Sequence, residues 1–416
     1  MNSIFDSSEF KVYADRWQRR LIELDRRRRY YDGSIYSPMY RHLQSSSEYG
    51  MLWPSLYQGI KPLYLPLARA VDVDAGIIPN NWQLAEDSDI FAEAVADVFA
   101  WSSWDTDGFL FVHYGAEFGC VGLKIVDDRK QKRIIIQAVK PTSYLLIETG
   151  AYDPSPATAI AIETKLDDAG SEFEYSEVIT AETIRTFSNG VPTGFDGREN
   201  EYQNELGFVP YVEVEHIKTG ELYGESTYQK AIPLLDEVNQ LASYFADIIG
   251  KHAEPQWIAI GAEASDLVKS GDNVWFMPSG SEVKPLVPNV DFDGILNFIK
   301  EIRDQVVGAL PELAFDDIKR KDQIATATLE LQLMELVLKI KRIRPNYDQG
   351  LADALRLAGR AGSTMQLPGI AVLDSEQLSF DANRDVLPLD RQTAIALELQ
   401  EISLEQMKGV AGGINA

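Results

Sequence analysis

The hydrophobic positions change their period along the chain, and these changes predict where helices and strands lie. Residues 8–31 carry apolar side chains at helical spacing and stop before Gly33, which predicts a helix. Between about residues 108 and 215, apolar and β-branched residues alternate with polar ones in stretches separated by Gly, Asp and Pro. This region is predicted to be an antiparallel sheet, with a tight turn or bulge at the paired glycines of "YGAEFGC".

Residues 224–255 predict a long helix that ends at Pro255. A second helix is predicted over 291–310, with Asp291 as its N-cap. Two or three short strands are expected between the two helices. We expect the two apolar stripes to pack together: Leu235, Leu241, Phe245 and Ile248 on the first helix against Ile295, Phe298, Ile299, Ile302 and Val306 on the second. A hairpin in the core of a monomer would give the same pattern.

Further helices are predicted on both sides of this hairpin. One lies between the prolines of residues 55–79 and ends at Gly76, and another begins near residue 326 and continues past Pro345. Residues 376–388 are expected to form a strand, followed by a last helix. The fold class is therefore α+β.

Composition adds an unusual charge to this picture. The 416 residues include 39 Lys and Arg against 64 Asp and Glu, a formal net charge of −25. A sequence-reading DNA-binding protein needs clustered cations, so this class is disfavoured. The single cysteine excludes a disulfide framework and fits a reducing compartment. No secretory signal or membrane span is expected, which predicts assembly in the cytoplasm.

Motifs for catalysis or cofactor binding are missing from the sequence. It contains no phosphate-binding G-x-x-x-x-G-K-[ST] loop, no H-x-x-x-H pair and no G-x-S-x-G nucleophile. "DVDAG" at residue 72 and "DFDG" at residue 291 resemble pieces of a calcium loop but lack its remaining ligands. Adjacent acids such as Asp316 and Asp317 arise by chance in so acidic a chain. We predict no enzyme activity, no metal and no cofactor.

Four separated stretches carry a resemblance to a known family. They are "LYGESTYQKAIPLLDEVNQLASYFADII", "LPELAFDDIKRKDQIATATLELQLMEL", "LSFDANRDVLPLDR" and the N-terminal "WPSLYQGIKPLYLPLARA". By these stretches and their order along the chain, the protein resembles the tailed-bacteriophage portal protein family, in which a G-x-S turn opens the first stem helix. It departs from the family at Ala325–Thr328, where Ser-Gly is common, and any crown after residue 361 should be small.

The resemblance implies a portal fold with named parts. These would be an α/β wing over 1–222, stem helices over 223–252 and 291–309, and a small β-containing clip over 253–290. A tunnel loop over 310–325 would lead into a long wing or crown helix over 326–360. Residues 361–416 would then form a wing return strand and a short helical crown.

The resemblance also implies a role and partners. Portal subunits form a ring of twelve at one capsid vertex of the virion, and double-stranded DNA enters and leaves through it without specific binding. The expected partners are other copies of the chain, the major capsid protein, the terminase large subunit and a head–tail adaptor protein. No membrane is involved.

Three sets of residues are the candidates for this role. The tunnel loop offers Asp316, Asp317, Lys319, Arg320 and Lys321 near the DNA, although a solvated loop is an equal alternative. Asp236, Glu237 and Asp247 would form an acidic stem face that repels phosphate and lets DNA slide. Trp257, Trp275, Phe276 and Met277 would make clip contacts between subunits, or form an ordinary hairpin core.

Two alternatives stay open at this stage. One is another phage structural ring or baseplate protein, which would lack a hairpin stem. The other is a carboxylate-dependent hydrolase, which would need acidic residues that converge in a buried cleft.

Overall fold

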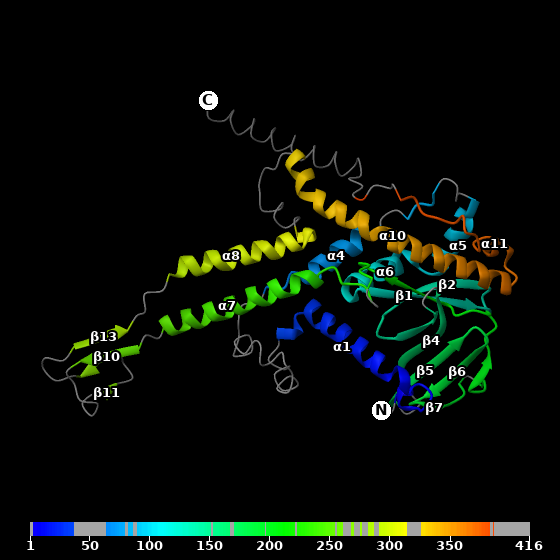
Figure 1. Cartoon of the computed structure of the whole chain (residues 1–416), viewed down its shortest axis with the longest axis horizontal. Coiled ribbons are helices and arrows are strands. Elements are labelled where there is room, and N and C mark those ends of the chain that lie inside the picture. The colour runs from blue at the N-terminus through cyan, green and yellow to red at the C-terminus, as the bar shows by residue number, and fades with distance from the viewer. Residues whose placement is uncertain are drawn as a thin grey trace, which may run out of the picture. The chain divides into compact units, whose positions relative to one another are not determined.

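The computed structural model describes residues 3–36, 64–79, 82–85, 90–150, 153–166, 170–195, 197–220, 223–253, 256–260, 268–269, 275–276, 282–286, 291–313, 326–382 and 386. The chain is a mixed α+β protein with antiparallel sheets (Figure 1). It divides into two compact units. The sheet unit comprises Met1–Arg27, Arg69–Thr227 and Ala314–Ala416, and the hairpin unit comprises Arg28–Ala68 and Tyr228–Leu313.

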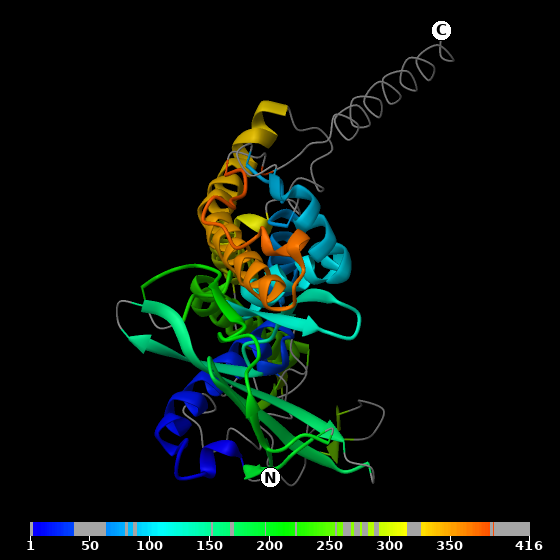
Figure 2. The same ribbon diagram turned by 90° about the vertical axis from the view of Figure 1, so that its right-hand side faces the viewer.

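The larger core of the sheet unit lies between a three-stranded sheet and a layer of helices. The strands are β1 (Cys120–Asp128), β2 (Arg133–Val139) and β9 (Tyr211–Glu215), in the antiparallel order β2-β1-β9. The helices are α5 (Ala92–Trp101), α6 (Trp104–Phe118), α10 (Thr326–Thr364) and α11 (Pro368–Ala371). Figure 2 shows these helices gathered on one side of β1 and β2, where apolar side chains of both layers are buried together.

Helix α6 corrects the prediction that strands begin near residue 108. Residues 104–118 are helical, because Trp104, Phe111 and Val112 repeat at helical spacing and are buried on one face. Gly115 lies inside this helix, and Gly119 ends it in the left-handed conformation, with φ of +84°. The turn expected at the two glycines is therefore a helix end. Aromatic and β-branched residues favour strands, but here packing on α10 outweighs that preference.

The second sheet confirms the antiparallel prediction for the residues after Gly119. It contains β3 (Tyr144–Gly150), β4 (Asp153–Leu166), β5 (Glu172–Thr180), β6 (Thr183–Ser188) and β7 (Val191–Pro192) in sequential order, and β8 (Glu201–Gln203) pairs with β6. Alternate residues serve opposite faces. Leu145 and Ile160 pack with the N-terminal segment η1 (Ile4–Asp6) and with α1 (Ala14–Tyr31), whereas Tyr144 and Ala161 pack with Tyr211.

The long helix predicted around Pro345 exists as one continuous element. Helix α10 has 39 residues with Pro345 inside it, and Pro345 is exposed. On the opposite face, apolar side chains are buried at intervals of three and four residues: Leu336, Ile340, Ile343, Tyr347, Leu351 and Leu355. An interior proline costs a helix about 3 kcal/mol, which this apolar stripe offsets by burial.

The prediction of a strand over 376–388 is wrong for its described part. Only an isolated bridge between Leu84 and Phe380 forms there. Leu378 and Phe380 are buried against the large core. Their alternation with polar residues arises because this irregular segment covers the helix layer, and not because it is a strand. The predicted last helix lies outside the described residues.

The hairpin unit is built around two long helices. Helix α7 spans Ile232–Ala253 and follows the short segment η6 (Gln229–Ala231), and α8 spans Phe292–Ala309 and leads into η8 (Pro311–Leu313). Strands β10 (Gln256–Ile260), β11 (Val268–Lys269), β12 (Trp275–Phe276) and β13 (Glu282–Leu286) come between the helices. Segment η3 (Ser34–Tyr36) also belongs to this unit, while α1 and α4 (Leu67–Ile77) have residues in both units.

Candidate functional site: the helical hairpin

The α7–α8 pair confirms the predicted hairpin of two helices. The two helices contact one another along the hairpin unit, as Figure 1 shows. Ile302 and Val306 of α8 are buried, as is Leu235 near the start of α7. Farther along, Phe245 meets Phe292 edge to face, with 5.9 Å between the ring centres. The predicted N-cap is also confirmed, since the Asp291 carboxylate accepts a hydrogen bond from the Gly294 backbone N–H at 2.9 Å.

The predicted stripe on α8 is only partly buried. Ile295 and Ile299 are half-buried, and Phe298 is 51% exposed. Tyr244, Ile249 and Leu296 are also large apolar side chains with 45–47% exposure on the two helices. The expected packing of Phe298 against α7 can therefore cover only about half of this residue in the single chain. Helix periodicity cannot separate a contact with the partner helix from an apolar side chain that no neighbour in the same chain covers.

Strands β10 and β13 connect the far ends of the two helices. They pair antiparallel, with Gln256 opposite Leu286 and Ile260 opposite Glu282. Strands β11 and β12 form a second short pair, in which Lys269 faces Trp275 and Val268 faces Phe276. Trp257 thus belongs to β10, and Trp275 and Phe276 belong to β12, whereas Met277 lies outside the described residues. Their role as clip contacts stays a prediction.

Asp236 corrects the predicted acidic face of the first helix. It is only 7% exposed, and its two carboxylate oxygens accept hydrogen bonds from the hydroxyls of Tyr30 at 2.8 Å and Tyr36 at 2.5 Å. Burial, and then the nearby Asp236 carboxylate, raise the pKa of Tyr36, so this hydroxyl stays a proton donor. Asp236 therefore anchors the base of α7 and does not face water.

A second polar contact fastens the same turn of α7. The Asn239 side chain accepts from the Tyr64 backbone N–H at 2.7 Å and donates to the Tyr64 carbonyl at 3.2 Å. Asn239 is fully buried, and Ser243 one turn later donates to the Asn239 carbonyl at 2.8 Å. Sequence reasoning missed these anchors because polar residues between apolar ones were assigned to a wet face.

The remaining acidic candidates have different positions. Glu237 is half-buried beside Asp236, and Asp247 lies on α7 within the described helix. The exposed side of α8 carries Asp293, Glu301 and Asp304, and Asp304 pairs with Arg303 at 2.8 Å. Asp316, Asp317, Lys319, Arg320 and Lys321 lie outside the described residues. The tunnel-loop prediction therefore stays a prediction.

The sheet unit contains a buried polar cluster that sequence reasoning missed. Asp74 of α4 is fully buried, and its Oδ2 accepts from the Thr227 hydroxyl at 2.5 Å. That hydroxyl accepts from Lys339 of α10 at 2.6 Å. His216 lies 3.5 Å from the same carboxylate oxygen through Nε2, and its Nδ1 is 2.7 Å from the Tyr347 hydroxyl. The only sequence signal was "DVDAG", which we excluded as a calcium loop.

Burial and the neighbouring charged groups together set the protonation states of Asp74 and His216 in this cluster. Burial favours the neutral form of Asp74, but Lys339 and His216 outweigh it and hold the pKa of this carboxyl below its usual value. Burial lowers the pKa of His216 even though Asp74 favours its charged form. A neutral His216 with its proton on Nε2 faces Asp74, and its Nδ1 then accepts from Tyr347. The cluster joins α4 and α10 to the segment after β9.

Two further observations bear on chemistry in the described part of the chain. Burial raises the pKa of Cys120 to about 12, so its thiol stays protonated and is a poor nucleophile. Among the described residues, no group of His, Cys, Asp and Glu side chains has the arrangement to hold a metal ion. No helix in this part of the chain is long and apolar enough to cross a membrane.

Neither a family model nor a curated protein matches the sequence. Among solved structures, the chain is similar to one in the virion of the native gene transfer agent particle, with a TM-score of 0.42 and 15% identity over 82% of this chain and 85% of that chain. It is also similar to a chain in the neck of the empty particle, computed with C6 symmetry, with a TM-score of 0.41 and 15% identity over 80% of this chain and 85% of that chain. A third similar chain lies in the neck of the native particle, computed with C12 symmetry, with a TM-score of 0.40 and 14% identity over 80% of this chain and 84% of that chain.

Proposed function

We propose that this chain is the portal subunit of a tailed-phage-like particle. Copies of the chain form a ring at one capsid vertex of the virion, and double-stranded DNA passes through the ring during packaging and ejection. The ring contacts the major capsid protein, the terminase large subunit during packaging, and later a head–tail adaptor. The chain acts by assembly and carries out no catalysis.

The observation that carries the proposal is the helical excursion from α7 to α8. Helix α7 has 22 residues and α8 has 18, so at about 1.5 Å per residue they measure roughly 33 and 27 Å. Between them the chain makes two short antiparallel strand pairs before it returns. A stem that ends in a small β-containing clip has this order of elements. The portal-like stretch that contains Gly224–Ser226 lies shortly before η6 and α7, which supports the assignment of α7 as the first stem helix.

Apolar side chains on the hairpin support assembly with other copies. Phe298, Leu296, Tyr244 and Ile249 are large and 45–51% exposed in the single chain. Large apolar groups that stay exposed in a single chain are candidates for protein interfaces. In a ring, each hairpin has a copy on either side, and these residues supply apolar area for that contact.

The charge of the chain supports passage of DNA in place of tight binding. A net charge of −25 per copy gives the ring a strongly negative field, which repels phosphate and gives no counterion release. Asp236 contributes little to such a wall because it is buried. The acids on the exposed side of α8, together with Glu237 and Asp247, are the stem residues that we assign to it.

Negative-stain electron microscopy of the purified protein tests the proposal. We expect closed rings with a central hole wide enough for duplex DNA. A compact monomer at all concentrations overturns the portal assignment. A ring without a projecting hairpin stem favours the alternative of another phage structural ring or baseplate protein. The number of copies is then counted in assembled particles, because isolated subunits can close into rings of a different size.

A further inference from the structure

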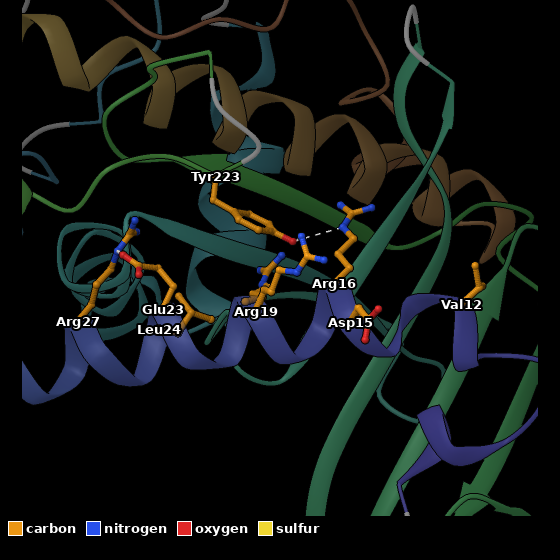
Figure 3. Close-up of a pocket in the computed structure, with 9 residues that line it drawn as sticks. Val12, Asp15, Arg16, Arg19, Glu23, Leu24, Arg27 and Tyr223 are labelled. Carbon is orange, nitrogen blue, oxygen red and sulfur yellow. Dashed lines mark hydrogen bonds and ion pairs between the residues drawn. The ribbon is translucent and has the colours of Figure 1, made fainter. Parts of the chain in front are cut away.

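A pocket of about 430 Å³ lies along helix α1 within the sheet unit (Figure 3). It is unrelated to the hairpin, and no step of the proposed function uses it. Its lining residues are Val12, Asp15, Arg16, Arg19, Arg20, Glu23, Leu24, Arg27 and Tyr223. This volume lies in the range of pockets that bind small groups, which is roughly 300–1,000 Å³.

The arginines reach the pocket because of their helical spacing. Arg16, Arg20 and Arg27 recur at intervals of four and seven residues, so they share one face of α1. Figure 3 shows Arg16, Arg19 and Tyr223 on the same side of this helix, with the Arg16 Nε donating to the Tyr223 hydroxyl at 3.3 Å. The four-residue run Arg26–Arg29 that stands out in the sequence is spread around the helix, and only Arg27 of that run lines the pocket.

Arg20 is the pocket residue whose side chain is held most firmly by its neighbours. Its side chain is 1% exposed, and its Nη2 donates to Glu213 at 2.6 Å while its Nε donates to the Pro141 carbonyl at 3.2 Å. The guanidinium lies 4.9 Å from the ring centre of Tyr144 and 4.6 Å from that of Tyr223. These contacts fix its position. Its Nη1 is buried and has no hydrogen-bond partner.

An unsatisfied N–H donor in a fixed, buried cation is costly unless a ligand accepts from it. The two acids of the pocket do not satisfy it. Glu23 is bound on its own helix by Arg27, with 3.3 Å between Oε1 and Nε. Asp15 is exposed and, in Figure 3, turns away from Tyr223. Arg20 therefore brings to the pocket wall one N–H group that no acceptor of the described residues meets, and Arg16 and Arg19 line the same pocket beside it.

The lining also limits the shape of the anion. Val12, Leu24, the Tyr223 ring and the hydrocarbon stems of the arginines make most of the wall apolar. A carboxylate on a short apolar stem matches both the arginines and the apolar wall, because its oxygens pair with guanidinium N–H groups while its methylenes contact the wall. A phosphate or a DNA backbone has no such stem.

We propose that this pocket binds a carboxylate carried on a short aliphatic stem, and that in the assembled protein this carboxylate is a Glu or Asp side chain of a second copy of the chain. The second part rests on the proposed ring, and it is favoured by charge complementarity. The pocket presents four arginines on a chain whose formal net charge is −25. Each pocket filled in this way joins two neighbouring copies.

Titration of unassembled, dilute protein with butyrate tests the pocket, with binding followed by NMR chemical shifts. Inorganic phosphate and butylammonium serve as comparison probes. We expect butyrate to bind more tightly than either, and the double variant Arg16→Glu/Arg19→Glu to weaken butyrate binding at least tenfold. Arg20 is left in place because its contacts with Glu213 are structural. Lys130→Glu, an exposed cation in the β1–β2 turn, is the control and should leave binding unchanged. Absence of butyrate binding, or equal binding by the double variant, overturns the proposal that this pocket binds a carboxylate.

The same variants in assembled protein test the source of the carboxylate. If a second copy fills the pocket, assembled protein does not bind butyrate, and the double variant requires at least tenfold more protein to assemble than Lys130→Glu does. Assembled protein that binds one butyrate per chain overturns the second copy as the source and leaves a free carboxylate as the ligand. If rings form equally well in the double variant, the proposed contact between this pocket and a second copy is wrong, while the portal function stands. A protein that forms no ring instead overturns the portal function.

Discussion

Residue positions in this protein are decided by contacts that the linear sequence does not reveal. Asp236 and Glu237 are adjacent acids in the same helix, yet Asp236 accepts two tyrosine hydroxyls in a buried site and Glu237 is half-buried beside it. The tyrosines come from α1 and η3, about two hundred residues earlier in the chain. Neighbouring acids on a helix point about 100° apart, so one can face the core while the other does not.

This difference gives a prediction for matched variants in α7. Asp236→Ala leaves the hydroxyls of Tyr30 and Tyr36 without their acceptor, and we expect the free energy of unfolding of the hairpin unit to fall by about 3 kcal/mol. Glu237→Ala, one residue away, should change it by about 0.5 kcal/mol or less. Urea unfolding followed by far-UV circular dichroism measures both values. Equal losses in the two variants would contradict the anchoring role of Asp236.

His216 gives a pH-dependent prediction. Burial lowers its folded-state pKa, so the unfolded chain binds more protons than the folded protein as the pH falls. The stability contributed by the neutral ring is fully present above about pH 6.5 and is lost as the pH falls through the folded-state pKa. We expect the free energy of unfolding to drop below pH 6.5 with a slope of at most about 1.4 kcal/mol per pH unit.

Unfolding at a series of pH values measures this slope, and His216→Gln is the comparison variant. The slope of the variant between pH 6.5 and 5 should be clearly smaller than that of the wild type, because the variant has no ring to protonate at residue 216. Asp74 acts in a separate window, since its pKa is lowered and its contribution is lost only below about pH 3.9. The same slope in variant and wild type would assign the effect to another group.

At the scale of elements, local sequence signals and tertiary packing agree in the hairpin and disagree in α6. The Asp291 cap, the period of α8 and the antiparallel strands after Gly119 follow from patterns of a few residues each. Helix α6 has strand-like composition but is helical because one face is buried against β1, β2 and α10. Composition reports a preference of about 1 kcal/mol, and burying a whole face of aromatic side chains exceeds it.

The cap of α8 gives a prediction at this scale. Asp291→Ala removes the acceptor for the Gly294 N–H, and we expect a loss of about 1 kcal/mol in the stability of the first turn of α8. Amide hydrogen exchange should then be faster over residues 292–296. Asp293→Ala is the control, because Asp293 is an exposed first-turn acid that is not the N-cap, and it should cost about 0.5 kcal/mol through the helix dipole. Faster exchange in the control than in the cap variant would be evidence against the cap.

At the scale of the whole molecule, the single chain exposes apolar side chains that the proposed ring would cover. Phe298→Asp puts a charge at such a position, and we expect it to reduce ring assembly at least tenfold. The stability of the single chain should fall by only about 1 kcal/mol, because about half of Phe298 is already exposed there. Sedimentation velocity measures the assembly, and chemical unfolding of dilute protein measures the stability. A loss of stability that matches the loss of assembly would place Phe298 in the core of the chain.

The predicted tunnel loop gives a separate functional test. Replacing Lys319, Arg320 and Lys321 together by Glu removes the cationic cluster of this loop, and we expect DNA packaging or DNA retention to fall while rings still assemble. Packaged DNA is measured as nuclease-resistant DNA in particles, and the rings are counted in micrographs. Unchanged packaging by this variant would remove the loop from the mechanism.

The sequence by itself determined the elements whose signals are local. It predicted the hairpin helices and their cap, the antiparallel strands, the helix that continues through Pro345, and an acidic chain with no catalytic motif. The tertiary structure alone decided which polar residues are buried, because Tyr30 meets Asp236 and Asp74 meets His216 and Thr227 only after distant segments pack together. It also decided that α6 is a helix and that Arg20 lines a pocket with one N–H group that no acceptor of the described residues meets. Periodicity reports which residues share a face, but only packing determines what covers that face.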